Sequence, residues 1–558
     1  MTPKSLHRPA LRAQRAPRSR SRHGIASDSR EYADSGQRHK VPQQSCIIRL
    51  CDVQFGLSRW EVALLSKSKI LAYRQCPRRL WLEVHRPDLK DEGTGPAIAI
   101  AAGQEVGALA RDLYDPAGTG RLINLPRLGF PAAFSATMQA LETRKPIFEG
   151  SFSAGRALAL ADILLPAKAR ARTAAWRMVE VKSAASVKDV HRDDLALQAH
   201  VVRSAGVDLS AVALAHIDSA WVYPGDGRYE GLLTEVDLTD EVAQRSHEAQ
   251  SWIVEASRIA DQPAMPDATT GSQCSHPYDC GFYGYCSSLE PQVEMPISWL
   301  PRLSKQIWVA QGVRDMRDIP DDALNDVQRR VRDCTVGDKI YFDRKGAKAD
   351  LAEHILPGYF LDFETIQFAV PVWAGTRPYQ QIPFQYSLHV LTPQGSLDHA
   401  EFLDLSGGDP SRPFAEHLIG HCANRGPVFV YHASFETSRL AELAQRFPDL
   451  ARRLEAIRAR VVDLLPIARN RYYHPAQEGS WSIKAVLPAA VPGLSYRKLD
   501  GVQNGGDAQQ AFLEAIRVET RAERRTVLRQ QLLAYCALDT YAMVRLWQVF
   551  AGRTRWRL

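Results

Sequence analysis

The chain of 558 residues is too long for one ordinary domain, and its length predicts two large domains or roughly three to four smaller ones. Its formal net charge is +7, but the first fifty residues hold eleven Lys and Arg against three Asp and Glu, so they carry 11 − 3 = +8 and the rest carries 7 − 8 = −1. No run approaches the roughly eighteen apolar residues of a membrane-spanning helix. Nine Cys, an odd number without a secretory signal, argue against a disulfide framework. We therefore expect a soluble, cytoplasmic protein with no membrane partner.

The N-terminal segment, residues 1–60, is where the positive charge gathers. It begins with an Arg- and Ser-rich stretch that lacks the apolar centre of a secretory signal. Two interpretations remain open for it. It is either a disordered basic tail that attracts nucleic acid, or the product of a start codon assigned upstream of the true one.

Residues 66–290 form the first predicted folded unit. Helices are expected over 66–83, 98–114 and 193–206, and strands over 157–165 and 176–183. Residues 291–350 are mixed and partly helical, and we predict a helical connector there. Residues 356–550 alternate strands with helices and end in a long helix, which predicts a second α/β domain. The expected fold class is therefore α/β in both domains.

An acidic and a basic residue share one face of a strand in the first unit. Glu180 and Lys182 lie at positions i and i+2 in "MVEVKS", and Asp162 ends the apolar run "LALAD" before them. Acids at such a site ligate a metal ion, and a neighbouring Lys can position or polarise the attacking water, so this set can hydrolyse a phosphodiester. The alternative is a salt bridge between Glu180 and Lys182 at a strand edge.

This first set resembles the PD-(D/E)xK nuclease core of the RecB type, whose downstream Q-A motif matches Gln198 and Ala199. The resemblance implies a restriction-endonuclease-like fold in which Asp162 and Glu180 are metal ligands, Lys182 is catalytic and Gln198 supports the site. Glu105 is a candidate for an earlier acid. Gly107 stands where many relatives have His.

Four cysteines of the first unit flank its nuclease core. Cys76 precedes the core, and Cys274, Cys280 and Cys286 follow it with the spacing C-x5-C-x5-C. Thiolates suit an iron-sulfur cluster or zinc equally well. The sequence resembles CRISPR-associated and AddB-type RecB nucleases, which implies a [4Fe-4S] cluster. The alternative is a set of ordinary buried or free cysteines. The remaining cysteines show no pattern and are expected to be small apolar residues: Cys46, Cys51, Cys334, Cys422 and Cys536.

Basic and aromatic side chains surround Cys76. Arg78, Arg79 and Trp81 could stack on and pair with a single nucleic-acid strand. The alternative is that they pack locally and cover a helix surface.

Two carboxylates lie on alternate positions of an apolar strand in "YFLDFET", residues 359–365. Asp362 and Glu364 therefore point to the same, buried side of the sheet. Buried like charges need a shared proton, a basic partner or a cation. The alternative is a strand edge on which both acids are solvated.

Further acids downstream can join this pair. Glu436 follows an apolar strand where the next helix should begin, and Tyr535 and Asp539 share one face of the last helix at i and i+4. Carboxylates that converge in this way bind magnesium or manganese. Asp463 in "VVDLL" is a further candidate ligand, or else it caps the following turn.

The ordered set of four acids and a tyrosine resembles the DEDDy exonucleases of the ribonuclease-H-like fold. The resemblance covers residues 356–550 and implies a mixed sheet, two metal ions held by Asp362, Glu364, Glu436 and Asp539, and an attacking water oriented by Tyr535. His432 stands where that family usually has Asn, and Glu436 where it usually has Asp.

The order of the two units also resembles an uncharacterised bacterial family that combines a RecB-type nuclease domain, a four-cysteine staple and a DEDDy 3′–5′ exonuclease domain. We therefore expect a metal-dependent nuclease with two sites and a nucleic-acid partner, in the first instance DNA. Two alternatives stay open: a nucleic-acid-binding or scaffold protein with one or both sites inactive, and an exonuclease that acts on RNA.

Overall fold

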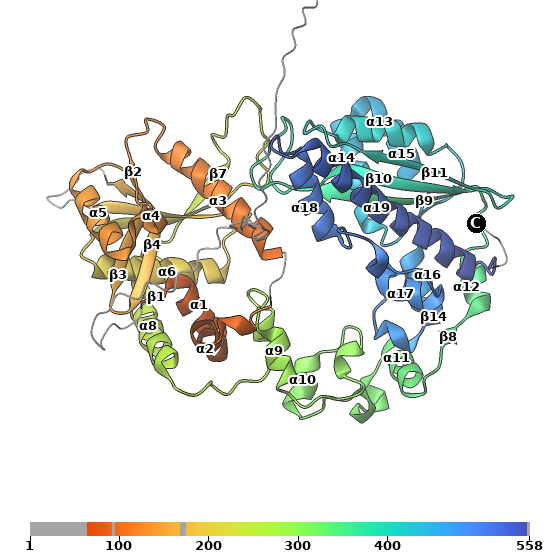
Figure 1. Cartoon of the computed structure of the whole chain (residues 1–558), viewed down its shortest axis with the longest axis horizontal. Helices are drawn as coiled ribbons and strands as arrows, with labels where there is room; N and C mark the ends of the chain where they lie inside the picture. The colour runs from red at the N-terminus through yellow and green to blue at the C-terminus, as the bar shows by residue number, and fades with distance from the viewer. Residues whose placement is uncertain (1–63, 92–94, 168–174, 555–558) are drawn as a thin grey trace, which may run out of the picture. The chain divides into compact units, whose positions relative to one another are not determined.

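The computed structural model describes residues 64–91, 95–167 and 175–554 of the chain (Figure 1). The tail predicted at residues 1–60, with Cys46 and Cys51, lies outside the described residues. The described part is an α/β protein that contains two large mixed sheets, which confirms the expected fold class.

The first sheet has seven strands and belongs to the first predicted unit. Its order is β2 (Arg121–Leu122), β3 (Ile147–Ala154), β4 (Ala157–Pro166), β5 (Trp176–Lys182), β6 (Leu209–Ile217) and β7 (Leu233–Asp237), and β1 (Leu65–Ser66) pairs with β4. The pairs β1–β4, β2–β3 and β5–β6 are parallel, and β3–β4, β4–β5 and β6–β7 are antiparallel. The sheet is therefore mixed.

Helices cover both faces of this sheet. One hydrophobic cluster contains buried residues of β5 and of α1 (Lys67–Gln75), α2 (Pro77–His85), α4 (Leu125–Leu128), α5 (Phe130–Glu142), α6 (Asp189–Ser204), α7 (Thr239–Gln244) and α8 (Ser246–Asp261). Ala110 of α3 (Gly95–Tyr114) lies in a second cluster with Val179. Met178 belongs to the first cluster and Val179 to the second, so side chains of β5 alternate between the two faces.

The predicted helix over residues 66–83 is two helices in the structure. Cys76 separates α1 from α2 with an extended backbone, φ −165° and ψ 124°. The physical reason is Pro77, because the ring of a proline disfavours helical backbone at the preceding residue. Cys76 therefore sits at a break between two helices.

The connector predicted over residues 291–350 packs into the core of the second domain. Helix α9 (Tyr283–Ser288) precedes the connector, which contains α10 (Lys305–Ala310), α11 (Asp326–Val336), β8 (Tyr341–Phe342) and α12 (Arg344–Asp350). Leu300, Met316 and Val331 are buried in the same hydrophobic cluster as Phe360 of the second sheet. β8 also pairs with β14 (Tyr472–Tyr473) in a small antiparallel sheet.

The second large sheet has five strands. Its order is β11 (Leu397–Leu403), β10 (Ile382–Leu391), β9 (Gly358–Ile366), β12 (Val428–Val430) and β13 (Val461–Asp463). β9 pairs antiparallel with β10 and parallel with β12. It is therefore the central strand, and both of its faces are available for burial.

The two faces of β9 pack against different helices. Phe360 and Ile366 share a cluster with α16 (Leu464–Arg471), α17 (Ile483–Ala490), α18 (Gly505–Ile516) and α19 (Ala522–Phe550). Leu361 and Phe363 face α13 (Ser411–His421), α14 (Ser434–Arg446) and α15 (Pro448–Arg458). Because residues of a strand alternate between faces, Asp362 and Glu364 lie on the α19 side.

Candidate functional site

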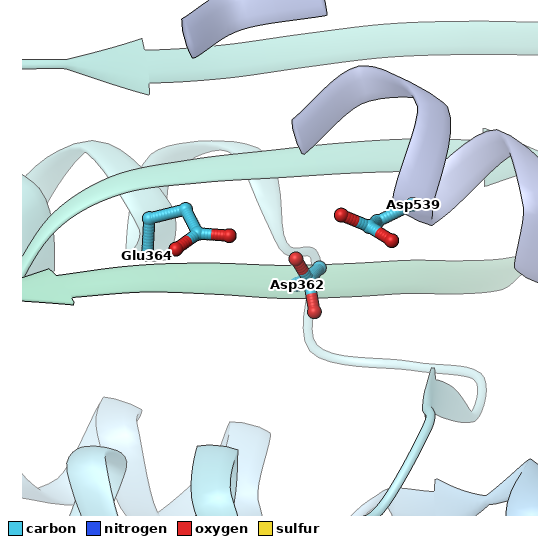
Figure 2. A group of neighbouring side chains, drawn as sticks. All are labelled: Asp362, Glu364 and Asp539. Carbon is cyan, nitrogen blue, oxygen red and sulfur yellow. The ribbon is translucent and has the colours of Figure 1, made fainter. Parts of the chain in front are cut away.

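Three carboxylates meet where α19 crosses β9. Asp362 and Glu364 project from the strand, and Asp539 reaches toward them from the helix (Figure 2). One ligand oxygen from each of the three lies within 4.8 Å of the others. Such a buried acidic triad could hold a metal ion, and carboxylate oxygens are the ligands that magnesium and manganese prefer.

The electrostatics of this triad favour a bound cation. Burial, then the charges of Asp539, Glu364 and Glu436, raise the pKa of Asp362 well above its usual value. Burial and the charge of Asp539 raise the pKa of Glu364 to about 8, and burial raises the pKa of Asp539 to about 6. A cation would offset both the lost hydration and the mutual repulsion, so the residues present fit a hard divalent ion.

Glu436, the fourth predicted acid, is buried but lies outside the group within 4.8 Å. It stands in the first turn of α14, which packs on the opposite face of the sheet from α19. Its Oε2 is buried and has no hydrogen-bond partner in the described part of the chain. Burial raises the pKa of Glu436 to about 8. An orphaned carboxylate oxygen beside an acidic triad is suited to a second ion.

The predicted Tyr535 lies in the same buried region and has a companion that the sequence did not indicate. Tyr496 donates a hydrogen bond of 2.5 Å from its hydroxyl to Oδ1 of Asp539. The rings of Tyr496 and Tyr535 meet edge to face at 6.3 Å. Burial and the charge of Asp539 raise the pKa of both hydroxyls, so both stay protonated and donate hydrogen bonds.

A lysine also stands beside this group. Nζ of Lys484 lies 5.1 Å from the ring centroid of Tyr535 and 5.3 Å from that of Tyr496, and donates to the carbonyl oxygen of Gln503 at 2.7 Å. Its charge acts to lower the pKa of Glu364 and Asp539 against the effect of burial. Lys484 occupies the first turn of α17 and belongs to no pattern that the sequence analysis recognised.

Asp463 acts as a capping residue. Its carboxylate accepts hydrogen bonds from the backbone N–H groups of His432 (2.9 Å), Ala433 (3.0 Å) and Leu465 (2.9 Å). The last of these caps α16, which was one of the two alternatives for this residue. The first two hold the turn between β12 and α14, where His432 has a left-handed φ of 81°.

The predicted residues of the first domain also come together, in a cavity of about 470 Å³ lined by Asp162, Glu180 and Lys182. Nζ of Lys182 donates to Oε1 of Glu180 at 2.7 Å. Oδ2 of Asp162 accepts from the backbone N–H of Val181 at 2.8 Å. Burial, then the charge of Glu180, raise the pKa of Asp162 well above its usual value.

Two further charged residues complete this group. Lys182 donates to Asp194 of α6, and Gln198 donates from Nε2 to Oδ1 of Asp194 at 3.0 Å. Nζ of Lys67, in α1, lies 2.9 Å from Oε1 of Glu180 and 3.7 Å from Oδ2 of Asp194. Gln198 therefore acts through Asp194. The "DDLALQ" stretch offered a signal for Asp194, because positions i and i+4 of a helix share a face.

The salt bridge between Glu180 and Lys182, one of the two interpretations of the sequence, is thus part of a larger arrangement of two lysines and two acids. Burial lowers the pKa of each lysine, but the charges of Asp194 and Glu180 outweigh it, so the pKa of Lys182 and of Lys67 is raised. Oε2 of Glu180 and Oε1 of Gln198 remain buried without a partner among the described residues. These two orphaned oxygens are compatible with a cation.

Glu105 and Gly107, both on α3, differ in their relation to this cavity. Glu105 is exposed, whereas Gly107 lines the cavity. A Cβ at Gly107 would meet nothing within 4 Å, so the cavity has room for a side chain at this position. Glu149, with a left-handed φ of 56°, is a further acid in the cavity wall that the sequence analysis did not single out.

The four predicted cysteines, Cys76, Cys274, Cys280 and Cys286, line one small cavity. They do not form a metal-binding cluster in the described ranges, because no three of their sulfur atoms lie mutually within 4.8 Å. A single zinc ion with Zn–S bonds of about 2.3 Å would need sulfurs roughly 4 Å apart, so the donor set is wider than a zinc tetrahedron. Burial raises the pKa of Cys280 and Cys286.

The basic and aromatic residues next to Cys76 are engaged in local contacts. Arg78 is buried and donates to the carbonyl oxygen of Pro266 at 2.9 Å, and Arg79 pairs with Glu83 at 3.0 Å. Trp81 donates to the carbonyl oxygen of Gln262 at 2.9 Å. These contacts favour the packing interpretation over strand binding. Among the other cysteines, Cys422 and Cys536 are buried and Cys334 is half-buried.

Comparison with known proteins identifies one domain family within the chain. A family described as a domain of unknown function, DUF2779, matches residues 359–482. That span contains Asp362, Glu364 and Glu436 and ends before Tyr496 and Asp539. No curated protein matches the chain. Across the described ranges, no helix is both long and apolar enough to cross a membrane.

Proposed function

We propose that the protein is a metal-dependent nuclease whose principal site is the triad Asp362, Glu364 and Asp539, with Glu436 beside it. The observation that carries the proposal is the meeting of three carboxylates within 4.8 Å, with Glu364 and Asp539 buried and Asp362 half-buried. Such an arrangement is costly unless a cation is bound. Hydrolysis at this site would add water across a P–O bond and leave a phosphate monoester and a free hydroxyl group.

Magnesium or manganese ions held by these carboxylates would activate the attacking water and stabilise the leaving oxygen. Tyr535 would orient that water as a hydrogen-bond donor, because its raised pKa rules out a role as a base at neutral pH. Tyr496 fixes the position of Asp539. The resemblance to DEDDy exonucleases supports cleavage from a strand end, and DNA is the substrate we favour over RNA.

We infer a second hydrolytic site of the RecB type at Asp162, Glu180 and Lys182. Its support is the cavity that these residues line, and the orphaned Oε2 of Glu180. Lys182 is charged there and would polarise a water molecule or a phosphate oxygen. Asp194 and Gln198 would hold the Lys182 ammonium in place.

One observation favours the alternative of an inactive, binding-only first domain. The ammonium groups of Lys67 and Lys182 both contact Oε1 of Glu180, so basic partners already balance this acid. If both contacts persist with substrate, Glu180 cannot ligate a metal ion fully. The first domain would then bind nucleic acid without cutting it, and cleavage would belong to the second domain.

For the cysteine group we propose a [4Fe-4S] cluster in preference to zinc. The four thiols line one cavity, yet their sulfurs lie further apart than a single zinc ion allows. A four-iron cluster is larger than one ion and is bound by four thiolates.

The test is cleavage of end-labelled single-stranded DNA, duplex DNA and RNA in magnesium or manganese by protein purified without oxygen. Asp362→Asn should abolish one activity and Lys182→Met a second one. The matched controls are Asp398→Asn and Lys145→Met, because both residues are exposed and lie outside the two sites. Binding of these substrates without any cleavage by the wild type would instead support the scaffold alternative.

A further inference from the structure

The second domain contains a cavity of about 760 Å³ whose lining residues His432 and Ile483 stand close in the chain to Glu436 and Lys484 of the carboxylate site. Arg302 and Asn325 from residues 291–350 form one wall, and His432, Arg469 and Trp481 from the second domain form the other. The connector and the second domain share one hydrophobic core through Leu300 and Val331, so this cavity is built into a single packed unit.

Two segments of the cavity wall are continuous in the chain with segments that carry residues of the site. His432 precedes α14, whose first turn carries Glu436. Trp481 and Ser482 precede α17, whose first turn carries Lys484, and the ammonium of Lys484 lies 5.1 Å from the ring of Tyr535. The cavity and the carboxylate site are therefore built in part from the same two segments of the chain.

The charge of the wall is positive and not neutralised. Neither Arg302 nor Arg469 forms an ion pair or a side-chain hydrogen bond with any residue that the structure describes. An acid in the wall, Asp326, already pairs with Arg329 at 2.5 Å. Two unpaired guanidinium groups at the mouth of a cavity are suited to phosphate, which they bind through parallel hydrogen bonds.

The backbone at His432 is held in an unfavourable conformation. Its φ of 81° lies in the left-handed region, which non-glycine residues adopt at a cost of roughly 1–3 kcal/mol. Asp463 fixes this turn through the N–H groups of His432 and Ala433. The exposed side chain of His432 is thereby presented at the cavity wall.

We propose that this cavity binds the sugar-phosphate backbone of the nucleic-acid strand that enters the carboxylate site. Arg302 and Arg469 contact phosphates, and His432 lies along the path to Glu436. The ligand is a phosphodiester chain, because its phosphate groups are what the unpaired guanidinium groups recognise. This inference rests on the proposed function, because it names the strand path of that same site.

The test uses fluorescence anisotropy to measure the binding of two labelled oligonucleotides of twelve nucleotides, oligothymidylate and oligouridylate. The titrations contain no divalent ions and are repeated at several salt concentrations. The double variant R302A/R469A should weaken binding about tenfold or more and reduce the salt slope by about two phosphate contacts. The control R452A/R453A removes two exposed arginines from α15 and should leave the affinity unchanged. The two oligonucleotides decide between DNA and RNA as the source of the strand.

The variant R302K/R469K keeps the positive charges but loses the parallel hydrogen bonds of the guanidinium groups, so it should lose less affinity than R302A/R469A. If the alanine pair fails to fold, the single variants R302Q and R469Q should each show a smaller loss of the same kind. Equal weakening by both alanine pairs, unchanged binding by R302A/R469A, or equal losses in the lysine and alanine pairs would overturn the inference.

Cleavage separates this inference from the proposed function. In magnesium or manganese, R302A/R469A should raise KM for the oligonucleotide and leave turnover of thymidine 5′-(4-nitrophenyl) phosphate unchanged, because that small substrate has no strand to place in the cavity. A wild type that binds the strand through both arginines yet never cuts would refute the proposed function and keep the cavity. If the wild type cuts the strand and R302A/R469A cuts it with the same KM, the proposed function stands and the inference about the cavity is refuted.

Discussion

The hydroxyl of Tyr496 lies 2.5 Å from Oδ1 of Asp539 and donates a hydrogen bond to it, although 43 positions separate them in the chain. Tyr496 is buried in a short 3-10 helix, Tyr496–Lys498. The bond holds down the pKa of Asp539, which burial raises to about 6. It therefore keeps one member of the triad in place and easier to ionise.

Tyr496→Phe should shift the pH dependence of cleavage to higher pH. Without its donor, the pKa of Asp539 rises further, so a higher pH is needed to ionise it before a metal ion can bind. We expect a fall of about tenfold in manganese affinity near neutral pH, since one lost hydrogen bond to a charged group is worth about 1.5–3 kcal/mol. Calorimetric titration with manganese and a pH–rate profile measure both effects.

The control is Tyr472→Phe, which removes a hydroxyl that donates to the carbonyl oxygen of Ala489 at 3.0 Å. That variant should leave the pH profile where it is. An unchanged profile in Tyr496→Phe would show that this bond does not tune Asp539.

The metal-free protein should lose stability as pH rises from about pH 5 to about pH 8. In the folded state the pKa values of Glu364 and Glu436 are about 8, and in the unfolded state both are near 4.3. The folded protein therefore binds more protons across this range, and ionisation favours unfolding. Thermal unfolding in a chelator should show a falling Tm, and magnesium should raise Tm more at pH 8 than at pH 5. A Tm that rises with pH in chelator would contradict this account.

Glu436→Gln should stabilise the metal-free protein while impairing cleavage. The buried Oε2 of Glu436 has no partner in the described residues, and a neutral amide avoids the cost of ionising it. At pH 8 in chelator the free energy of unfolding should increase by about 2 kcal/mol. Urea unfolding measures this gain, and it should vanish near pH 4, where the carboxyl group is protonated in both states. Exposed Glu401→Gln on β11 is the matched control.

Asp194→Asn should destabilise the first domain. Asp194 is buried and accepts hydrogen bonds from Lys182 and Gln198. Without its charge, Lys67 and Lys182 keep Glu180 as the one acid of this group that they contact. Removing one partner of a buried ion pair costs roughly 3–5 kcal/mol. Asp189→Asn, in the exposed first turn of the same helix, should cost less than about 1 kcal/mol. Urea unfolding of both variants decides the matter, and equal losses would contradict the arrangement.

Cys280→Ser should remove the metal from the cysteine group without altering cleavage at the triad. Protein purified without oxygen should be brown and contain iron, and the variant should be colourless. Cys422→Ser, a buried cysteine beside Arg460 in the second domain, should keep the colour. Zinc in place of iron, or equal metal content in the two variants, would refute the iron-sulfur proposal.

The sequence by itself determined the local geometry of the site. The two-residue repeat of strand β9 placed Asp362 and Glu364 on one face of the sheet. The i, i+4 spacing on helix α19 placed Tyr535 and Asp539 on one face of that helix. The same reasoning set Glu180 and Lys182 side by side on β5. In each of these pairs the two residues are two positions apart on a strand or four positions apart on a helix. The repeat of the backbone alone therefore places both side chains on the same face.

Tertiary structure decided which of these faces meet and which other residues join them. The packing of α19 on β9 brings Asp539 to Asp362, whereas Glu436, on the helix of the opposite face, stays outside the closest group. Three further residues of the two sites come from segments distant in the chain: Lys67, Lys484 and Tyr496. No local repeat connects a side chain in a short turn to a helix 43 residues away, so only the packed chain shows that Tyr496 bonds Asp539.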